Sequence, residues 1–229
     1  HYKYMGHWIA DKTGAEFKSI IHYGCSYVNL QSFTYLRLTR CPNEQKITDE
    51  ILQKSKPGDI VVLSSFSIPR IATLDSAANK TELLKSITTK EQWQSRNEIL
   101  NRSIPIVQSL EDAGLHVVLA APTPVYVSPP DRCNRWFNKM NPICHQGFKE
   151  DKAFEEALRA PVMKSYTALA KATGATLWDP FPLLCPKQTI CYSESKGRYL
   201  YVDQHHLSSN GNLLLVQSFI DLTRGLWKN

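Results

Sequence analysis

Short runs of purely apolar residues, separated by stretches with helical periodicity, are the feature that most restricts how this chain can fold. The two longest runs, Ile60 to Leu63 and Val117 to Ala121, have the length of a strand and are apolar at every position. A strand that is apolar on both faces is typical of a parallel sheet covered on both sides by helices. The alternation therefore predicts a three-layer α/β domain with a central parallel sheet.

Helical spacing and turn residues divide the rest of the chain. Met5, Trp8 and Ile9 have the i, i+3, i+4 spacing of a helix that Gly14 would end. The other predicted elements are, in chain order, a strand over Lys18 to Tyr23, a helix near Thr48 to Lys54, a strand over Ile60 to Ser64, a helix within Lys90 to Ala113 that Pro105 would bend, a strand over Leu115 to Ala121, an irregular segment from Pro122 to Lys149, a helix over Lys152 to Thr173, a strand over Thr176 to Asp179 and a helix from about Ser208 to Arg224.

Asp203 and His206 stand where the last predicted loop meets the last helix, and they are the strongest candidate site. An aspartate three residues ahead of a histidine can fix the tautomer of an imidazole that acts as a general base. Such a pair predicts a partner nucleophile near the first strand. Active sites of this fold class lie beyond the carboxyl ends of the strands. Other residues predicted at that edge are Gly24, Ser64, Ser65, Pro122 to Tyr126 and Asp179. The alternative is an ordinary loop carboxylate beside a histidine at a helix N-terminus.

Length and charge limit the class of protein. A chain of 229 residues with 42% hydrophobic residues can bury a full core and is most economically one domain. Its apolar runs are far shorter than the roughly 20 residues of a membrane span. The net charge of +6 favours anionic partners, but the basic residues are scattered rather than gathered in a stripe. We therefore do not expect nucleic-acid binding.

Six cysteines fall into three sequential pairs, Cys25 with Cys41, Cys133 with Cys144 and Cys185 with Cys191. Six cysteines allow 15 connectivities, so the sequence favours this pairing, through the turn-rich residues that each pair encloses, without proving it. Zinc spacing and Cys-x-x-Cys motifs are absent, and we predict no metal site. The cysteines favour an oxidising compartment over the alternative of buried thiols in a cytosolic protein.

Several stretches of the chain resemble the SGNH hydrolase superfamily, especially the periplasmic SGNH domains fused to acyltransferase-3 membrane domains. The final block, Asp-x-x-His followed by a helix, is matched by Asp203 and His206. The other matching stretches are Tyr23 to Cys25, Asp59 to Leu63, Arg159 to Pro161, Asp179-Pro180, Leu184 to Pro186 and Gly197 to Ser208. The resemblance implies a flavodoxin-like α/β/α fold. The first block of this superfamily is Gly-Asp-Ser, often followed by His, which His1 fits. We therefore expect the nucleophilic serine and the first strand to precede residue 1, so that residues 1–229 form a single SGNH-type domain without them.

The resemblance also implies roles for individual residues. His206 would deprotonate the serine and Asp203 would orient the imidazole. Gly24 matches the second block and would contribute a backbone N–H to the oxyanion hole. Phe66 stands where the family often has asparagine, so Ser65 is the candidate that would compensate.

Four residues stay open on the sequence alone. Gly24 is equally well explained as a turn glycine, and Ser26 is a weaker candidate nucleophile inside the chain. Arg132 and Trp136 are candidates for sugar binding, because guanidinium groups and aromatic faces suit sugars and acidic groups. A disulfide-braced surface loop explains these last two about as well.

Three functions remain possible. The resemblance implies an O-acyltransferase, and more specifically an O-acetyltransferase. It would receive the acyl group from an acyltransferase-3 membrane domain and pass it to a cell-surface polysaccharide at the periplasmic face of the bacterial inner membrane. An esterase would use the same residues with water as the acceptor, since both reactions share an acyl-enzyme. A glycan-binding protein without the serine would be a pseudoenzyme. None of these functions requires a cofactor.

Overall fold

The computed structural model describes residues 2–21, 27–28, 43–64 and 77–226. The elements in these residues are α1 (Lys3–Thr13), α2 (Glu44–Lys54), β1 (Ile60–Leu63), α3 (Ala77–Ile87), α4 (Lys90–Asp112), β2 (His116–Ala120), α5 (Pro130–Cys133), the 3-10 helices η1 (Trp136–Asn138) and η2 (Pro142–Cys144), β3 (Lys149–Asp151), α6 (Lys152–Thr173), β4 (Thr176–Trp178), α7 (Phe181–Leu184), β5 (Ile190–Tyr192), β6 (Glu194–Ser195), β7 (Arg198–Tyr199) and α8 (Ser209–Thr223).

The central sheet has the parallel strand order β1-β2-β4. Val61 is in register with Val117 and Leu119 with Leu177, so β2 is paired on both sides. Alternate residues of β2 face opposite sides of the sheet. Val117 and Leu119 pack into one hydrophobic core, and Val118 and Ala120 pack into a second. This double burial explains why the strand is apolar at every position and confirms the predicted parallel sheet.

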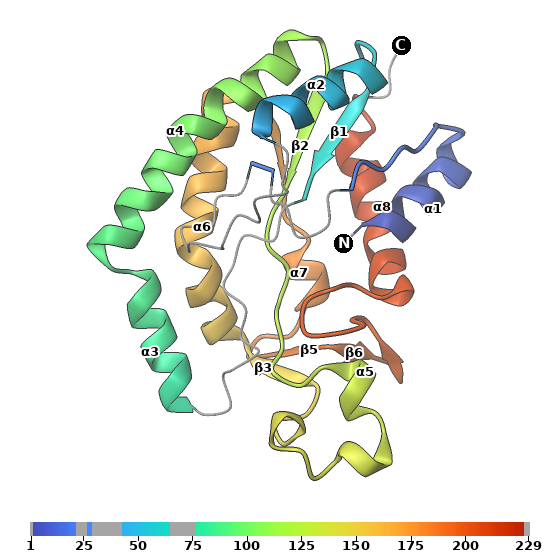
Figure 1. Cartoon of the computed structure of the whole chain (residues 1–229). Helices are drawn as coiled ribbons and strands as arrows, with labels where there is room; N and C mark the ends of the chain where they lie inside the picture. The colour runs from blue at the N-terminus through green and yellow to red at the C-terminus, as the bar shows by residue number, and fades with distance from the viewer. Residues whose placement is uncertain (1, 22–26, 29–42, 65–76, 227–229) are drawn as a thin grey trace.

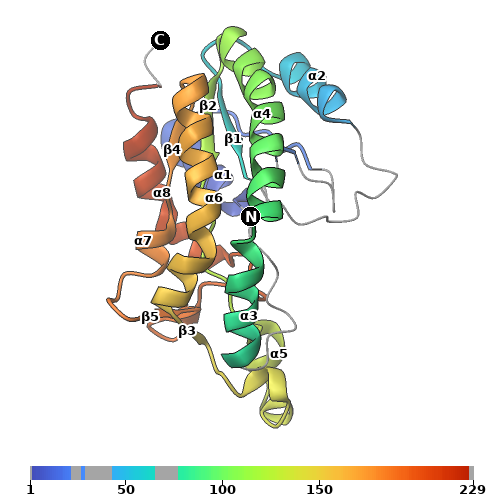
Figure 2. The same cartoon turned by 90° about the vertical axis from the view of Figure 1, so that its left-hand side faces the viewer.

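Helices cover both faces of the sheet, as Figures 1 and 2 show. Helices α2, α4 and α6 supply the first core with residues such as Ile47, Val107 and Leu158. Helices α1 and α8 supply the second core with residues such as Met5 and Leu215. The prediction of a three-layer α/β fold is confirmed.

Several helix boundaries follow from local sequence. The Asp151 carboxylate accepts a hydrogen bond from the backbone N–H of Phe154 at 2.9 Å and so begins α6. Gly174, with φ of 81°, ends that helix, and Gly14, with φ of 74°, ends α1. A left-handed backbone of this kind favours glycine. The structure confirms the predicted helices at these places.

Two predictions about elements were wrong or incomplete. Residues 18–21 do not form the expected strand, and residues 22 and 23 lie outside the described residues. The 122–149 segment is not wholly irregular, because it contains α5, η1, η2 and the start of β3. Helix α3 was also not predicted.

No helix among the described residues is long and apolar enough to cross a membrane.

Two of the three predicted disulfides are present. Cys133 is bonded to Cys144, and Cys185 is bonded to Cys191. The first braces a projecting segment, residues 129–147, which we call the disulfide lobe and which lies at the bottom of Figure 1. The second lies in the second core and joins the end of α7 to β5. The predicted Cys25–Cys41 pair lies outside the described residues.

Candidate active site

The carboxyl ends of the three central strands meet at one edge of the sheet, as the parallel pairing requires. Ser64 follows β1, the segment from Ala121 follows β2, and Asp179 follows β4. The loop that carries Asp203 lies against the segment after β2, because the backbone N–H of Tyr126 donates to the carbonyl oxygen of Gln204 at 2.8 Å. The structure therefore places Asp203 and His206, which we call the dyad, at the carboxyl edge of the sheet, as predicted.

Asp203 and His206 are in direct contact. The Nδ1 atom of His206 lies 2.6 Å from Oδ2 of Asp203. The other carboxylate oxygen, Oδ1, accepts the backbone N–H groups of His205 at 2.9 Å and His206 at 2.7 Å. The backbone N–H of Val202 donates to the carbonyl oxygen of His206 at 2.8 Å and closes the turn. Both oxygens of the carboxylate are thus engaged within a single turn, which holds the imidazole ring in place.

The surroundings of Asp203 favour its ionised form. Burial opposes ionisation, but the hydrogen bond with the His206 side chain and the two backbone N–H donors outweigh it, so the pKa of Asp203 lies well below its usual range. A carboxylate at Nδ1 fixes the tautomer that leaves Nε2 free of a proton, as a general base requires. The His206 side chain is 51% exposed and accessible to a substrate. The pair has the geometry of the base and orienting acid of a hydrolase triad.

His205 lies beside the Asp203–His206 pair, and its side chain is only 13% exposed. Its ring lies against that of His206 with the centroids 4.1 Å apart, and its Nδ1 is 3.7 Å from Oδ1 of Asp203. Ligand atoms of Asp203, His205 and His206 all lie within 4.8 Å of one another and could hold a metal ion. An ion at Nε2 of His206 would occupy the nitrogen that acts as the general base, and an ion at Nδ1 would displace the proton shared with Asp203. The cluster therefore serves either the Asp203–His206 pair or a metal, but not both.

Gln204 fastens the dyad loop to the segment that follows β2. Its side-chain Nε2 donates to the carbonyl oxygen of Val127 at 2.8 Å, while its own carbonyl accepts from Tyr126. The backbone N–H of Asp131 also donates to the carbonyl oxygen of Val202 at 2.9 Å. These contacts hold both ends of the dyad turn against one segment.

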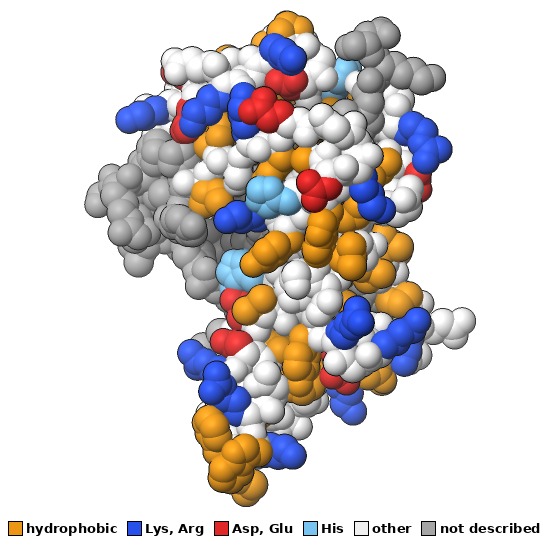
Figure 3. Space-filling model, turned by 90° about the vertical axis from the view of Figure 1, so that its right-hand side faces the viewer, with side chains coloured by type: hydrophobic (Ala, Val, Ile, Leu, Met, Phe, Trp, Pro, Cys, Tyr) orange, Lys and Arg blue, Asp and Glu red, His pale blue; other side chains and the backbone are white. Residues whose placement is uncertain are grey.

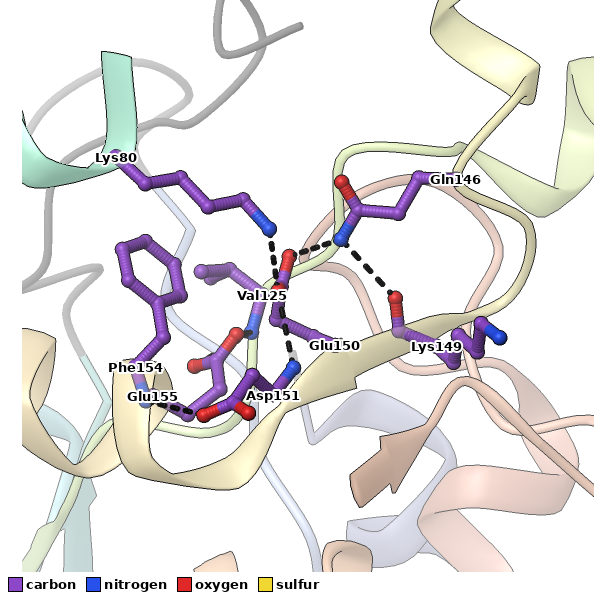
Figure 4. A network of polar contacts seen from close by, with 8 residues as sticks. All are labelled: Lys80, Val125, Gln146, Lys149, Glu150, Asp151, Phe154 and Glu155. Atoms are coloured by element: carbon purple, nitrogen blue, oxygen red, sulfur yellow. Dashed lines mark hydrogen bonds and ion pairs between the residues drawn. The ribbon is translucent and has the colours of Figure 1, made fainter. Parts of the chain in front are cut away.

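Glu155 in turn holds that segment from the side of α6. Its buried carboxyl accepts the backbone N–H of Val125 at 3.2 and 3.3 Å. Figure 4 shows it beside a second buried carboxylate, Glu150, which pairs with Lys80 at 2.5 Å and accepts from Gln146 at 2.6 Å. Burial, and then the charge of Glu150, raise the pKa of Glu155 well above its ordinary value.

Arg159 and Asp179 belong to two stretches that carried the family resemblance, and the structure joins them. The Arg159 guanidinium donates to Oδ1 of Asp179 at 2.6 Å and lies over the ring of Phe181, 4.3 Å from its centroid. Asp179 also accepts the backbone N–H of Phe181 at 3.0 Å. This pair ties α6 to the loop after β4 at the same edge as the dyad.

The start of α8 brings α1 to this edge. Ser208 begins α8 by accepting the backbone N–H of Gly211 at 3.2 Å. Asn212, which is fully buried, accepts the backbone N–H of Met5 at 3.2 Å. Tyr2 packs on Trp178, the last residue of β4, with ring centroids 5.2 Å apart. The N-terminus of α1 therefore lies at the carboxyl edge of the sheet, close to the helix that follows the dyad.

The remaining predicted site residues are not brought to this edge by any described contact. Gly24 and Ser65, the candidates for the oxyanion hole, lie outside the described residues, as do Ser26 and Phe66. Arg132 and Trp136 lie in the disulfide lobe, and Trp136 is 80% exposed. Their role in sugar binding stays a prediction.

Sequence reasoning missed Gln204, Glu155 and the Arg159–Asp179 pair as supports of the site. The signal for two of them was present. Glu155 and Arg159 are one helical turn apart and lie on the same face as Leu158 and Val162, where a charged residue is costly unless it has a partner. Gln204 carries no such signal, since a glutamine in a loop has no periodic context.

Comparison with known proteins identifies the family. The sequence pattern of SGNH domains fused to AT3 domains matches residues 1–221. The chain belongs to this family. The family is of the hydrolase and acyltransferase kind, which agrees with the geometry of Asp203 and His206.

Two solved structures share the fold. One is described as an SGNH hydrolase from Slackia heliotrinireducens, with a TM-score of 0.50 and 14% identity over 96% of this chain and 90% of that chain. The other is the periplasmic domain of a lipopolysaccharide acetyltransferase from Salmonella ser. Paratyphi A, with a TM-score of 0.50 and 11% identity over 97% of this chain and 77% of that chain. No curated protein matches the chain.

Proposed function

We propose that this chain is the O-acyltransferase domain of a membrane protein and transfers an acetyl group to a cell-surface polysaccharide through a serine acyl-enzyme. The observation that carries the proposal is the 2.6 Å contact between His206 Nδ1 and Asp203 Oδ2 at the carboxyl edge of the sheet. Membership of a family named for its fusion to AT3 domains favours transfer over hydrolysis. The likeness to a lipopolysaccharide acetyltransferase domain concerns the fold, and it supports a glycan as the acceptor.

The reaction would run in two acyl transfers. His206 Nε2 takes the proton of the serine hydroxyl as the serine oxygen attacks the acyl carbonyl, and the departing donor group receives that proton. A sugar hydroxyl then attacks the acyl-enzyme, His206 takes its proton, and the serine oxygen leaves with that proton. Asp203 stays ionised throughout and stabilises the imidazolium, which its strongly engaged carboxylate suits.

The serine is proposed to precede His1. Support comes from α1, whose first turn is bonded to Asn212 of α8, the helix that follows His206. A residue immediately before this turn would be within reach of the carboxyl edge. Gly24 and Ser65 remain the proposed oxyanion donors, and the AT3 domain remains the proposed source of the acyl group on the periplasmic side of the inner membrane.

The test measures acetyl transfer from a chromogenic ester to an oligosaccharide by the intact protein, with mass spectrometry of the sugar. We expect transfer to fall about 10⁴-fold in an Asp203→Asn variant, because the wrong imidazole tautomer is then favoured, and at least as far in His206→Ala. The matched control is Asp131→Asn, an exposed aspartate nearby whose contact with the dyad loop is made by its backbone.

The outcomes separate the candidate functions. Unchanged acetyl transfer in His206→Ala would refute the mechanism in which His206 is the general base. Ester hydrolysis that depends on His206 but yields no acetylated sugar would assign an esterase. Oligosaccharide binding without any acyl chemistry would assign a glycan-binding pseudoenzyme.

A further inference from the structure

The disulfide lobe presents large apolar side chains to solvent at its tip. Trp136 is 80% exposed, Phe137 is 58% exposed and Met140 is 85% exposed. Figure 3 shows hydrophobic side chains gathered at the far end of the molecule, at the bottom of the view. Such a cluster on a projection, rather than scattered single residues, marks an interaction surface.

The lobe is built to hold these side chains outward. The Cys133–Cys144 disulfide closes it, and the Asn138 side chain donates to the carbonyl oxygen of Arg132 at 2.9 Å. Trp136 and Phe137 pack edge to face with their centroids 5.8 Å apart. Because the backbone is already fixed, binding through this tip would lose little conformational entropy.

The charge around the tip is mostly positive, because the one carboxylate of the lobe, Asp131, lies at its base, where its backbone N–H contacts the loop of Asp203 and His206. Residues 132–149 contain no aspartate or glutamate. Their four lysines and arginines are all exposed: Arg132, Arg135, Lys139 and Lys149. The next carboxylate along the chain, Glu150, is buried and paired with Lys80. An exposed aromatic and methionine cluster with a cationic rim complements a surface that is apolar inside and anionic outside.

A sugar subsite fits these observations less well. Small-molecule and sugar sites are concave and cover most of the ligand. The tip is a projection on which each of the three apolar side chains is more than half exposed. Tryptophan flanked by lysine and arginine is instead typical of segments that lie at the interface of a bilayer.

We propose that the tip of the disulfide lobe docks on an anionic lipid bilayer, with Trp136, Phe137 and Met140 entering the interfacial region and Arg135 and Lys139 contacting lipid headgroups. The docking requires neither the serine nor the dyad, and so it goes beyond the proposed function. It would orient the domain above a membrane, because the chain leaves the lobe directly into β3, which pairs with β5, and the backbone N–H of Asp131 at the other end of the lobe donates to the carbonyl oxygen of Val202.

The test places an environment-sensitive fluorophore at the tip. Met140→Cys is labelled with a nitrobenzoxadiazole probe in the intact protein, which is reconstituted with vesicles of phosphatidylcholine, alone or mixed with phosphatidylglycerol. The matched control is Trp93→Cys, which replaces another exposed apolar residue, 59% exposed, on α4. We expect the probe at position 140, and not at position 93, to shift its emission to shorter wavelength and to be quenched by lipids that carry a nitroxide on the acyl chain.

A second variant tests the role of charge. Adding Lys139→Glu to the labelled protein should lower the phosphatidylglycerol-dependent part of lipid association about fivefold or more. Equal aqueous emission at positions 140 and 93 would overturn the proposal. A shifted but unquenched probe would also overturn it, because the tip would then rest on protein. A response to oligosaccharide and not to lipid would assign a glycan site. Ester turnover by the Met140 variant reports on the dyad separately, so failure of one proposal is distinguishable from failure of the other.

Discussion

Replacing the buried Glu155 with glutamine should stabilise the protein, and the effect should grow with pH. The carboxyl is 1% exposed and its pKa is raised well above the ordinary 4.5, first by burial and then by Glu150. Glutamine has nearly the shape of the protonated acid, and its carbonyl oxygen can still accept the backbone N–H of Val125. The variant therefore keeps the hydrogen bond and removes only the ionisation.

The sign follows from the direction of the shift. A carboxyl whose pKa is higher in the folded state stabilises the fold below its unfolded pKa, and that contribution is lost as pH rises toward the folded pKa. Below pH 4.5 the wild type and Glu155→Gln should therefore be about equally stable. Between pH 4.5 and the pKa of Glu155 in the folded protein, the free energy of unfolding of the variant should rise relative to that of the wild type by ~1.4 kcal/mol per pH unit.

The assay is urea-induced unfolding, followed by tryptophan fluorescence at a series of pH values for both proteins. The control is Glu156→Gln, the neighbouring residue, whose side chain is 57% exposed and should give no such dependence. A stability difference between Glu155→Gln and the wild type that is constant with pH would refute the assignment of Glu155 as a buried acid with a raised pKa. A Glu155→Leu variant, which removes the acceptor for the loop N–H, should instead lose stability at every pH.

Three further perturbations address the supports of the site. Gln204→Ala removes the side-chain bond to Val127 that holds the dyad loop. It should lower kcat about tenfold with little change in KM, because this bond positions the dyad and not the substrate. It should also reduce the free energy of unfolding by about 1–2 kcal/mol. Gly211→Ala should destabilise the fold by about 2 kcal/mol or more in urea unfolding, since its Cβ would lie in steric conflict with the backbone oxygen of Leu200. Removing the Cys185–Cys191 bond by a double change to alanine should lower the unfolding free energy by about 2 kcal/mol, as expected for a short closed loop.

The first two of these substitutions have matched controls in the chain. Gly225→Ala should be nearly neutral, because nothing lies within 4 Å of the added Cβ. Gln108→Ala removes a half-buried glutamine of α4 whose side chain donates to Asp112 on the next turn, and should leave kcat unchanged. Equal loss of activity in Gln204→Ala and Gln108→Ala would contradict the positioning role.

Local patterns predicted much of this fold because the forces involved act over a few residues. Apolar runs marked β1 and β2, and capping residues such as Asp151 and Gly174 marked the ends of α6. The same applies to the Asp203–His206 contact, which joins residues three apart. Two disulfides, Cys133–Cys144 and Cys185–Cys191, were also predicted, since each closes a short loop.

Other features depend on contacts between residues distant in sequence, and no local pattern predicts them. The strand expected over Lys18 to Tyr23 is not formed by residues 18–21, its described part, because a strand needs a partner that the local sequence does not specify. The disulfide lobe was expected to be irregular, and only its folding shows which of its apolar side chains remain outside.

The sequence by itself determined the layered α/β class, most helices, and a carboxylate–imidazole pair, because these follow from periodicity, capping and short spacing. Only the tertiary structure decided what holds that pair in place. The backbone bond from Tyr126 to Gln204 joins residues 78 positions apart, and Glu155 reaches Val125 across 30. Such contacts form only when the sheet has brought the ends of its strands to one edge, which is why the site is a property of the fold and its reactive residues a property of the sequence.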